Sequence, residues 1–133
     1  MGLHTALYRA SGGRLGHTIP GVPGKMLLLD HTGAKSGTKR TSPLLYVRDG
    51  DDVVVVASKG GFPKHPAWYH NLVANPDTTV QIGSHHLQVH ARVAKPDERD
   101  RLWKLAVKAY RGYEDYAARS KGREIPLVIL EPR

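Results

Sequence analysis

Four consecutive valines at positions 53–56 limit most strongly what this chain can fold into. β-Branched side chains favour strands, and a strand with one wet face would alternate apolar and polar residues. The unbroken run therefore predicts a strand, over residues 53–58, that is covered on both faces. The chain has 133 residues, so we expect one domain over residues 1–133, with residues 1–25 as an irregular lead-in.

Glycine and proline signals divide the rest of the chain into short elements. Asp49-Gly50 predicts a tight hairpin turn, and Pro43 predicts an edge position or a bulge within its strand. The hairpin links favour an α+β fold with about six mostly antiparallel strands and two or three helices, which can close into a small barrel. The other expected strands are 26–32, 39–48, 78–82, 85–93 and 125–131, and the expected helical segments are 3–10, 66–75, 96–109 and 113–121.

Composition and spacing exclude several classes of site. Cysteine is absent, so disulfides, thiolate nucleophiles and iron–sulfur clusters are excluded. His86 and His90 share the polar face of an expected strand, and the spacing between His65 and His70 suits no common metal pattern. We therefore predict no metal site. The glycine patterns of dinucleotide and triphosphate sites are also missing.

The charge of the chain points to an anionic partner. The net charge is +8 and the pI is about 9.9, which suits nucleic acid, a membrane surface or a phosphorylated small molecule. The longest apolar runs, 26–29 and 53–57, are far shorter than the roughly 20 residues of a spanning helix. The N-terminal segment does not resemble a secretory signal, so we expect a cytoplasmic protein with no integral membrane segment.

Two basic, glycine-rich loops at 33–42 and 58–64 stand out. Gly33 and Gly37 can take positive φ, and glycines let the backbone approach a ligand closely. Lysine and arginine side chains bind phosphate or carboxylate oxygens strongly. The loops are therefore either a binding site for an anion or two solvated turns. They contain no acidic residue, and their cations are Lys35, Lys39, Arg40, Lys59 and Lys64.

Aromatic residues form a third group. Trp68 occurs on the expected helix after the second loop, and Tyr110, Tyr113 and Tyr116 recur every three residues. Each ring taken singly favours a place in the core. Three tyrosine hydroxyls on one segment also suit a pocket with apolar walls and polar tips.

Several long segments resemble the deazaflavin-dependent nitroreductase family. The resemblance runs from about residue 26 to 132, and its most specific part is the string ASKGG-x-x-K-x-P-x-W-Y-x-N at 57–71. The other segments are LLLDHTGAKSGTKRTSPLLYVRDGD, RDRLWKLAVKAYRGYEDYAAR and REIPLVILEP. Members of this family are actinobacterial enzymes that use reduced coenzyme F420, and they include quinone reductases.

The resemblance implies a split β-barrel like that of the flavin-mononucleotide-binding oxidases, with coenzyme F420 in a basic groove. The cofactor's phosphate and oligoglutamate tail would lie along Lys35, Ser36, Arg40, Ser42 and Pro43. The deazaflavin ring would lie near Ala57, Ser58, Lys59, Gly60, Trp68 and Asn71. The acceptor pocket would contain Ser58, Tyr110, Tyr113 and Tyr116 as the catalytic residues.

The expected reaction is hydride transfer from reduced F420 to a quinone, a nitroaromatic or an activated double bond. Two alternatives keep the fold: an enzyme that uses flavin mononucleotide (FMN), and a protein that binds F420 without catalysis. A nucleic-acid binder would need exposed aromatics on its sheet, where this chain has aliphatics, so we predict no nucleic-acid partner. The resemblance leaves open a homodimer and a peripheral contact with the inner face of the membrane.

Overall fold

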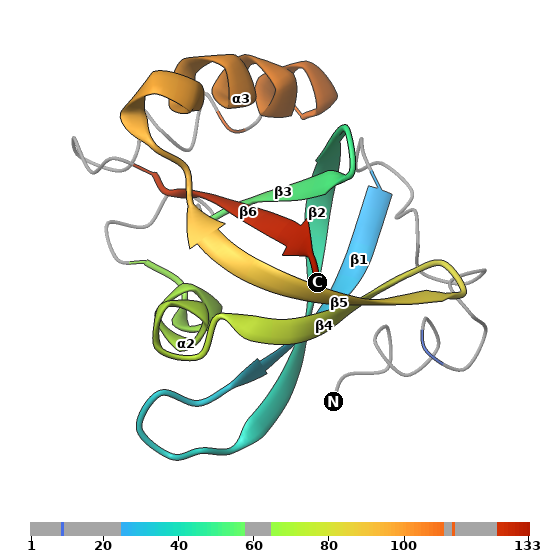
Figure 1. Cartoon of the computed structure of the whole chain (residues 1–133), viewed down its shortest axis with the longest axis vertical. Helices are drawn as coiled ribbons and strands as arrows, with labels where there is room; N and C mark the ends of the chain where they lie inside the picture. Colours follow the sequence, from blue (N-terminus) through green and yellow to red (C-terminus); the bar gives the residue numbers. More distant parts are fainter. Residues whose placement is uncertain (1–8, 10–24, 58–64, 111–112, 114–124) are drawn as a thin grey trace.

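A barrel with two helices packed against it makes up the part of the chain that the computed structural model describes, namely residues 9, 25–57, 65–110, 113 and 125–133 (Figure 1). The expected segments 3–10 and 113–121 lie outside this part, apart from Arg9 and Tyr113. The elements are β1 (Lys25–Thr32), β2 (Lys39–Asp49), β3 (Asp52–Val56), α2 (Ala67–Ala74), β4 (Asp77–Ile82), β5 (His85–Val93), α3 (Pro96–Ala109) and β6 (Leu127–Pro132).

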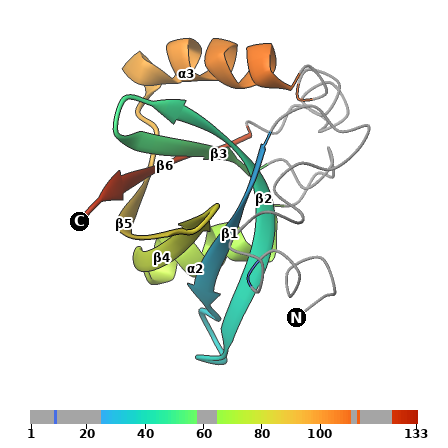
Figure 2. The same ribbon diagram turned by 90° about the vertical axis from the view of Figure 1, so that its right-hand side faces the viewer.

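The six strands form a closed barrel in the order β1-β2-β3-β6-β5-β4, and every pair is antiparallel (Figure 2). The barrel closes where β1 meets β4, through Leu28 opposite Gln81 and Leu29 opposite Val80. The predicted α+β architecture with six antiparallel strands is confirmed. Closure depends on contacts between strands that are far apart in the chain, which local periodicity does not reveal.

The valine run is covered on both faces, as predicted. Val53 and Val55 belong to the core cluster inside the barrel, together with residues such as Leu27 and Leu130. Val54 and Val56 belong to a second cluster that includes Leu102 and Ala106 of α3. The helix lies across the outside of the barrel (Figure 1). One strand therefore links the barrel interior to the layer beneath α3.

Pro43 lies on β2, opposite Leu28 of β1 in the register of the two strands. Among the described residues, β2 pairs with β3 only from Val47 to Asp49. The missing N–H of Pro43 therefore breaks no described bond of the β2–β3 ladder. The edge position or bulge that the sequence indicates at Pro43 stays a prediction.

Glu98 supports the first turn of α3 and provides a stability test. Its Oε1 accepts a hydrogen bond from the Lys95 N–H at 2.7 Å, and the carboxylate pairs with Arg92. The Arg92 side chain, then the Lys95 N–H, lower the pKa of Glu98 from 4.5 to about 2. The folded pKa lies below the unfolded value, so this stabilisation is complete above about pH 4.5 and disappears as the pH falls toward 2.

We expect Glu98→Gln to lower the free energy of unfolding by about 1 kcal/mol at pH 7, because it loses an ion pair and weakens a cap. Urea unfolding at pH values from 7 to about 2 should show the gap between variant and wild type closing in acid. Asp97→Asn changes an exposed carboxylate in the same turn and is the matched control. A gap for Glu98→Gln that stayed constant with pH would contradict the assigned ion pair.

Candidate functional site

A groove of about 740 Å³ opens where the β1–β2 turn meets α2. Figure 1 shows the turn and the helix on the same side of the barrel. The turn and the start of β2 provide one wall, and the first half of α2 provides the other. The groove is lined by Gly33, Ala34, Lys35, Ser36, Arg40, Ala67, His70 and Asn71. Four predicted cofactor-binding residues, Lys35, Ser36, Arg40 and Asn71, are therefore brought together.

The β1–β2 turn is closed by its own backbone. The Gly33 N–H donates to the Thr38 carbonyl at 2.8 Å, and the Gly37 N–H donates to the Gly33 carbonyl at 3.0 Å. Gly37 has a φ of 69°, as predicted for this turn. Gly33 is not among the described glycines with positive φ. A Cβ there would lie 2.4 Å from the Ser36 Oγ, so the short Ser36 side chain would have to rotate to make room for it.

The charge of the groove suits an anion. Lys35 and Arg40 are exposed at its wall, and the lining residues include no carboxylate. Neither cation forms an ion pair with a carboxylate of the described part of the chain. Ser36 adds a hydroxyl and Asn71 an amide. This donor set fits a ligand that carries phosphate or several carboxylates.

A buried chain of hydrogen bonds lies beneath the groove. The Ala34 N–H donates to the Asn71 Oδ1 at 2.9 Å, and the Asn71 Nδ2 lies 2.9 Å from the His31 Nδ1. The His31 Nε2 lies 2.8 Å from the Ser42 Oγ. The chain therefore joins the turn, α2, β1 and β2. Two predicted cofactor-binding residues, Ser42 and Asn71, belong to it.

His31 is a site residue that the sequence analysis missed. Its side chain is buried, at 5% exposure. Burial first, and the charge of Arg40 second, lower the pKa of this imidazole. The signal was present in the period-two pattern, because His31 follows Leu27 and Leu29 on the inward face of β1. An inward polar residue at the end of such a row indicates the rim of the barrel.

A second groove, of about 530 Å³, adjoins the first through Arg40. The Asp30 carboxylate in it accepts hydrogen bonds from Arg9 at 3.0 Å, Thr41 at 2.8 Å and Thr79 at 3.0 Å. These three donors satisfy the only carboxylate among the lining residues of this groove. Arg40 thus forms part of the wall of both grooves.

The remaining predicted cofactor residues have different surroundings. Trp68 and Ala57 are buried in the cluster inside the barrel, at 8% and 0% exposure. The Ala57 N–H donates to the Pro126 carbonyl at 3.0 Å. Pro43 lies on β2, one residue beyond Ser42. Predicted residues that lie outside the described part of the chain are Ser58, Lys59, Gly60 and Tyr116.

Tyr110 and Tyr113 lie beside α3. Their rings meet edge to face, with centroids 5.0 Å apart, and Tyr113 also lies 6.4 Å from the Trp103 ring. Tyr113 is 6% exposed and belongs to the cluster beneath α3, against which Tyr110 packs. The core placement expected for single tyrosines is therefore observed for Tyr113. The two residues lie next to each other, as the three-residue spacing predicted.

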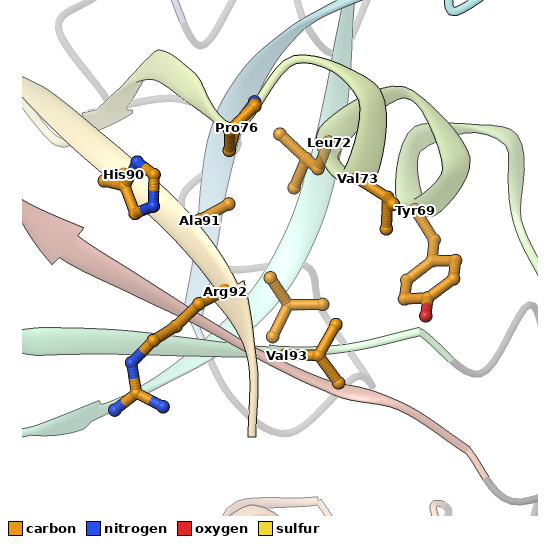
Figure 3. A pocket seen from close by; sticks show the side chains of 9 residues that line it. Tyr69, Leu72, Val73, Pro76, His90, Ala91, Arg92 and Val93 are labelled. Atoms are coloured by element: carbon orange, nitrogen blue, oxygen red, sulfur yellow. The ribbon is translucent and has the colours of Figure 1, made fainter. Parts of the chain in front are cut away.

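An apolar cavity of about 240 Å³ lies between α2 and β5 (Figure 3). Tyr69, Leu72 and Val73 of α2 face Ala91 and Val93 across it. Its described lining residues His90 and Arg92 already have partners: His90 lies 2.6 Å from the Asp77 carboxylate, and Arg92 pairs with Glu98 and Glu131. Among the described residues this cavity therefore offers no unpaired arginine or lysine for a phosphate, and the groove at the β1–β2 turn is the better anion site.

No group of three or more histidine, aspartate or glutamate side chains is placed to hold a metal ion within the described part of the chain. Neither of the described helices has the length and apolar character needed to cross a bilayer.

Known proteins resemble this chain over nearly its whole length. A sequence model described as F420H(2)-dependent quinone reductase matches residues 1–132. An F420H(2)-dependent quinone reductase of Mycobacterium tuberculosis (strain ATCC 25618 / H37Rv) is 46% identical, over 98% of this chain and 89% of that protein.

Solved structures give the same result. One described as an F420-H2 dependent reductase is 47% identical, covers 80% of this chain and 93% of its own, and has a TM-score of 0.73. One described as a domain-swapped dimer is 40% identical, covers 96% and 92%, and has a TM-score of 0.76. The haem storage protein HutZ of Vibrio cholerae, at 16% identity, 81% coverage of both chains and a TM-score of 0.56, shares the fold alone. The expected split-barrel fold is confirmed.

Proposed function

This chain belongs to the F420H(2)-dependent quinone reductase family, and we propose that it is an enzyme that reduces a quinone, a nitroaromatic or an activated double bond with F420H(2). The bound coenzyme supplies the hydride, and the protein supplies binding, orientation and electrostatics. The observation that carries this proposal is the groove at the β1–β2 turn. Its two cations, which form no ion pair with a described carboxylate, and the lack of a carboxylate among its described lining residues suit a phosphate and an oligoglutamate tail.

The tail of the coenzyme would lie along β2 and the turn before it. Arg40 and Lys35 would bind its anionic groups, with Ser36 and the half-buried Ser42 nearby and Pro43 on the same strand. Arg40 can bind a phosphate or a carboxylate through two parallel hydrogen bonds. Asn71 is held against the turn by the Ala34 N–H, so it forms a rigid part of the wall.

The ring would lie toward the segment that follows β3. Ala57 directly follows that strand, Ser58, Lys59 and Gly60 come next in the sequence, and Trp68 and Asn71 are on the helix beyond. Holding the donor and acceptor atoms about 3–3.5 Å apart provides much of the acceleration in such a transfer. We assign Ser58, Tyr110, Tyr113 and Tyr116 to the acceptor side, where hydroxyl groups would stabilise charge on the acceptor oxygen.

Ser58→Ala and Tyr113→Phe should each lower kcat by about three- to tenfold, because each removes one neutral hydrogen bond to the acceptor oxygen. The affinity for F420 should stay unchanged in Tyr113→Phe, because that residue is assigned to the acceptor side alone. Stopped-flow oxidation of F420H(2) by menadione or a nitroaromatic measures the step. Tyr8→Phe, at a tyrosine to which we assign no role, is the control. Full turnover of both variants with every acceptor would remove these residues from the mechanism.

Fluorescence titration with F420 and with FMN tests the proposal as a whole. We expect saturable quenching of F420 at micromolar concentrations, no binding of FMN, and oxidation of F420H(2) that depends on an added quinone. Binding of FMN alone would favour the flavin alternative. Binding of F420 without turnover, across a panel of acceptors, would favour a carrier.

The assembly and location of the protein belong to the same proposal. A homodimer is supported by the 40% identical relative described as a domain-swapped dimer. A cytoplasmic location, with peripheral contact at the inner face of the membrane, suits an enzyme that reduces quinones. No nucleic-acid partner is proposed, because the anionic coenzyme accounts for the basic loops.

A further inference from the structure

His31 lies at the centre of a hydrogen-bond chain that ties three walls of the groove together. It comes from β1, it contacts Asn71 of α2 at 2.9 Å and Ser42 of β2 at 2.8 Å, and Asn71 reaches the turn at Ala34. Both His31 and Asn71 are buried, at 5% and 7% exposure. Neither side chain can therefore replace these bonds with bonds to bulk water at low cost.

The donor and acceptor of each hydrogen bond in the chain follow from the Ala34 N–H, at which the chain begins. The Ala34 backbone N–H can only donate, so the Asn71 oxygen accepts and the Asn71 amide nitrogen faces the imidazole. That nitrogen can only donate, so the His31 Nδ1 must accept and carries no proton. The ring proton is then on Nε2, which donates to the Ser42 Oγ. The neutral Nε2–H tautomer is the one form of His31 that satisfies the whole chain.

We propose that His31, in this neutral form, is a positioning residue for the anion groove: it holds Asn71 against the β1–β2 turn and orients the Ser42 hydroxyl. Protonation of Nδ1 would place two donors face to face and release Asn71. The proposal rests on the proposed function, because the ligand it positions for is the F420 tail. His31 itself does not touch the ligand.

The charged groups around His31 disfavour protonation of its ring. Arg40 lies directly opposite His31 in the register of β1 and β2, and Asp30 precedes it in β1. The other titratable groups that border the two grooves are His70 of α2, Lys35 of the turn, Lys39 of β2 and Arg9. Burial and Arg40 both lower the pKa of His31 and so keep the ring neutral at pH 7.

The pH dependence of binding tests the role of His31. Protonation of His31 breaks the chain and should weaken binding of the anion as the pH falls. The ligand's own titration is the same for every variant, so it cancels in the comparison with wild type.

Two substitutions at His31 test the proposal through the Kd for F420, measured by fluorescence between pH 5 and 8. His31→Gln retains one acceptor and one donor, and we expect a Kd within about threefold of wild type at pH 7 and a smaller loss of affinity in acid. His31→Leu removes both groups, and we expect the Kd to rise about tenfold. His86→Leu, at an exposed histidine on β5, is the matched control and should leave binding unchanged.

A spectroscopic measurement on the wild-type protein covers the case in which His31→Leu does not fold. The ¹⁵N spectrum of the imidazole should show an unprotonated Nδ1 and a protonated Nε2 at pH 7. The opposite tautomer or an imidazolium at pH 7 would overturn the proposal, as would unchanged F420 binding and pH dependence in both His31 variants. Failure of the wild type to bind F420 would instead overturn the proposed function.

Discussion

Arg40→Gln is expected to weaken the binding of coenzyme F420 by about ten- to a hundredfold, because a charge-assisted hydrogen bond to phosphate or carboxylate contributes roughly 1.5–3 kcal/mol. Arg40 is exposed and lines both grooves, so its loss removes a cation from the whole binding surface. It forms no ion pair with a carboxylate of the described residues, so folding stability should change little. Fluorescence titration gives the Kd, and urea unfolding gives the stability.

The matched control lies on the same strand. Arg48 is also exposed on β2, but it borders a different groove, with Lys25 of β1 and Lys108 of α3. Arg48→Gln makes the same change in net charge and should leave the F420 affinity within about twofold of wild type, because the remaining effect is long-range and screened by salt. Equal losses in the two variants would show that overall charge, rather than the groove, controls binding.

Leu130→Ala is expected to lower the free energy of unfolding by about 3–5 kcal/mol. Leu130 is fully buried, at 0% exposure, and lies between Val53 of β3 and Ala91 of β5 in the barrel ladder. Truncation leaves a cavity inside a closed barrel, whose strands cannot move together to fill it without changing their hydrogen-bond register. Urea unfolding measures the loss, with an unchanged m-value indicating an intact native state.

An exposed valine on α2 provides the matched control for Leu130→Ala. Val73 on α2 is 59% exposed, and Val73→Ala should change the free energy of unfolding by no more than about 0.5 kcal/mol. A loss below about 1 kcal/mol in Leu130→Ala would show that the barrel interior tolerates cavities and that the core assignment is wrong.

Much of the fold follows from local pattern. The valine run predicted a strand covered on both faces, and Val53 and Val54 do pack into different clusters. Asp49-Gly50 predicted a hairpin, and Gly50 has a φ of 62° there. These features depend on side-chain alternation and on backbone conformation over a few residues. Both properties depend on residues that are neighbours in the sequence.

The candidate site was predicted in part. Lys35, Ser36, Arg40 and Asn71 were expected to bind the cofactor, and they do line one groove. Gly33 and Gly37 can both take positive φ, and of the two Gly37 does so in the structure. The roles of Ser58, Tyr110, Tyr113 and Tyr116 stay predictions. They depend on the resemblance to the family and on the experiments above.

The role of His31 could not be predicted from the sequence. Its partners Asn71 and Ser42 are 40 and 11 positions away, and no local pattern links the three. The sequence by itself determined the strands, the turns and the excess of basic residues, because each follows from neighbouring side chains. Only the tertiary structure decided the closure of the barrel, the grouping of the groove residues and the tautomer of His31. Each of these depends on which distant groups lie within hydrogen-bond reach.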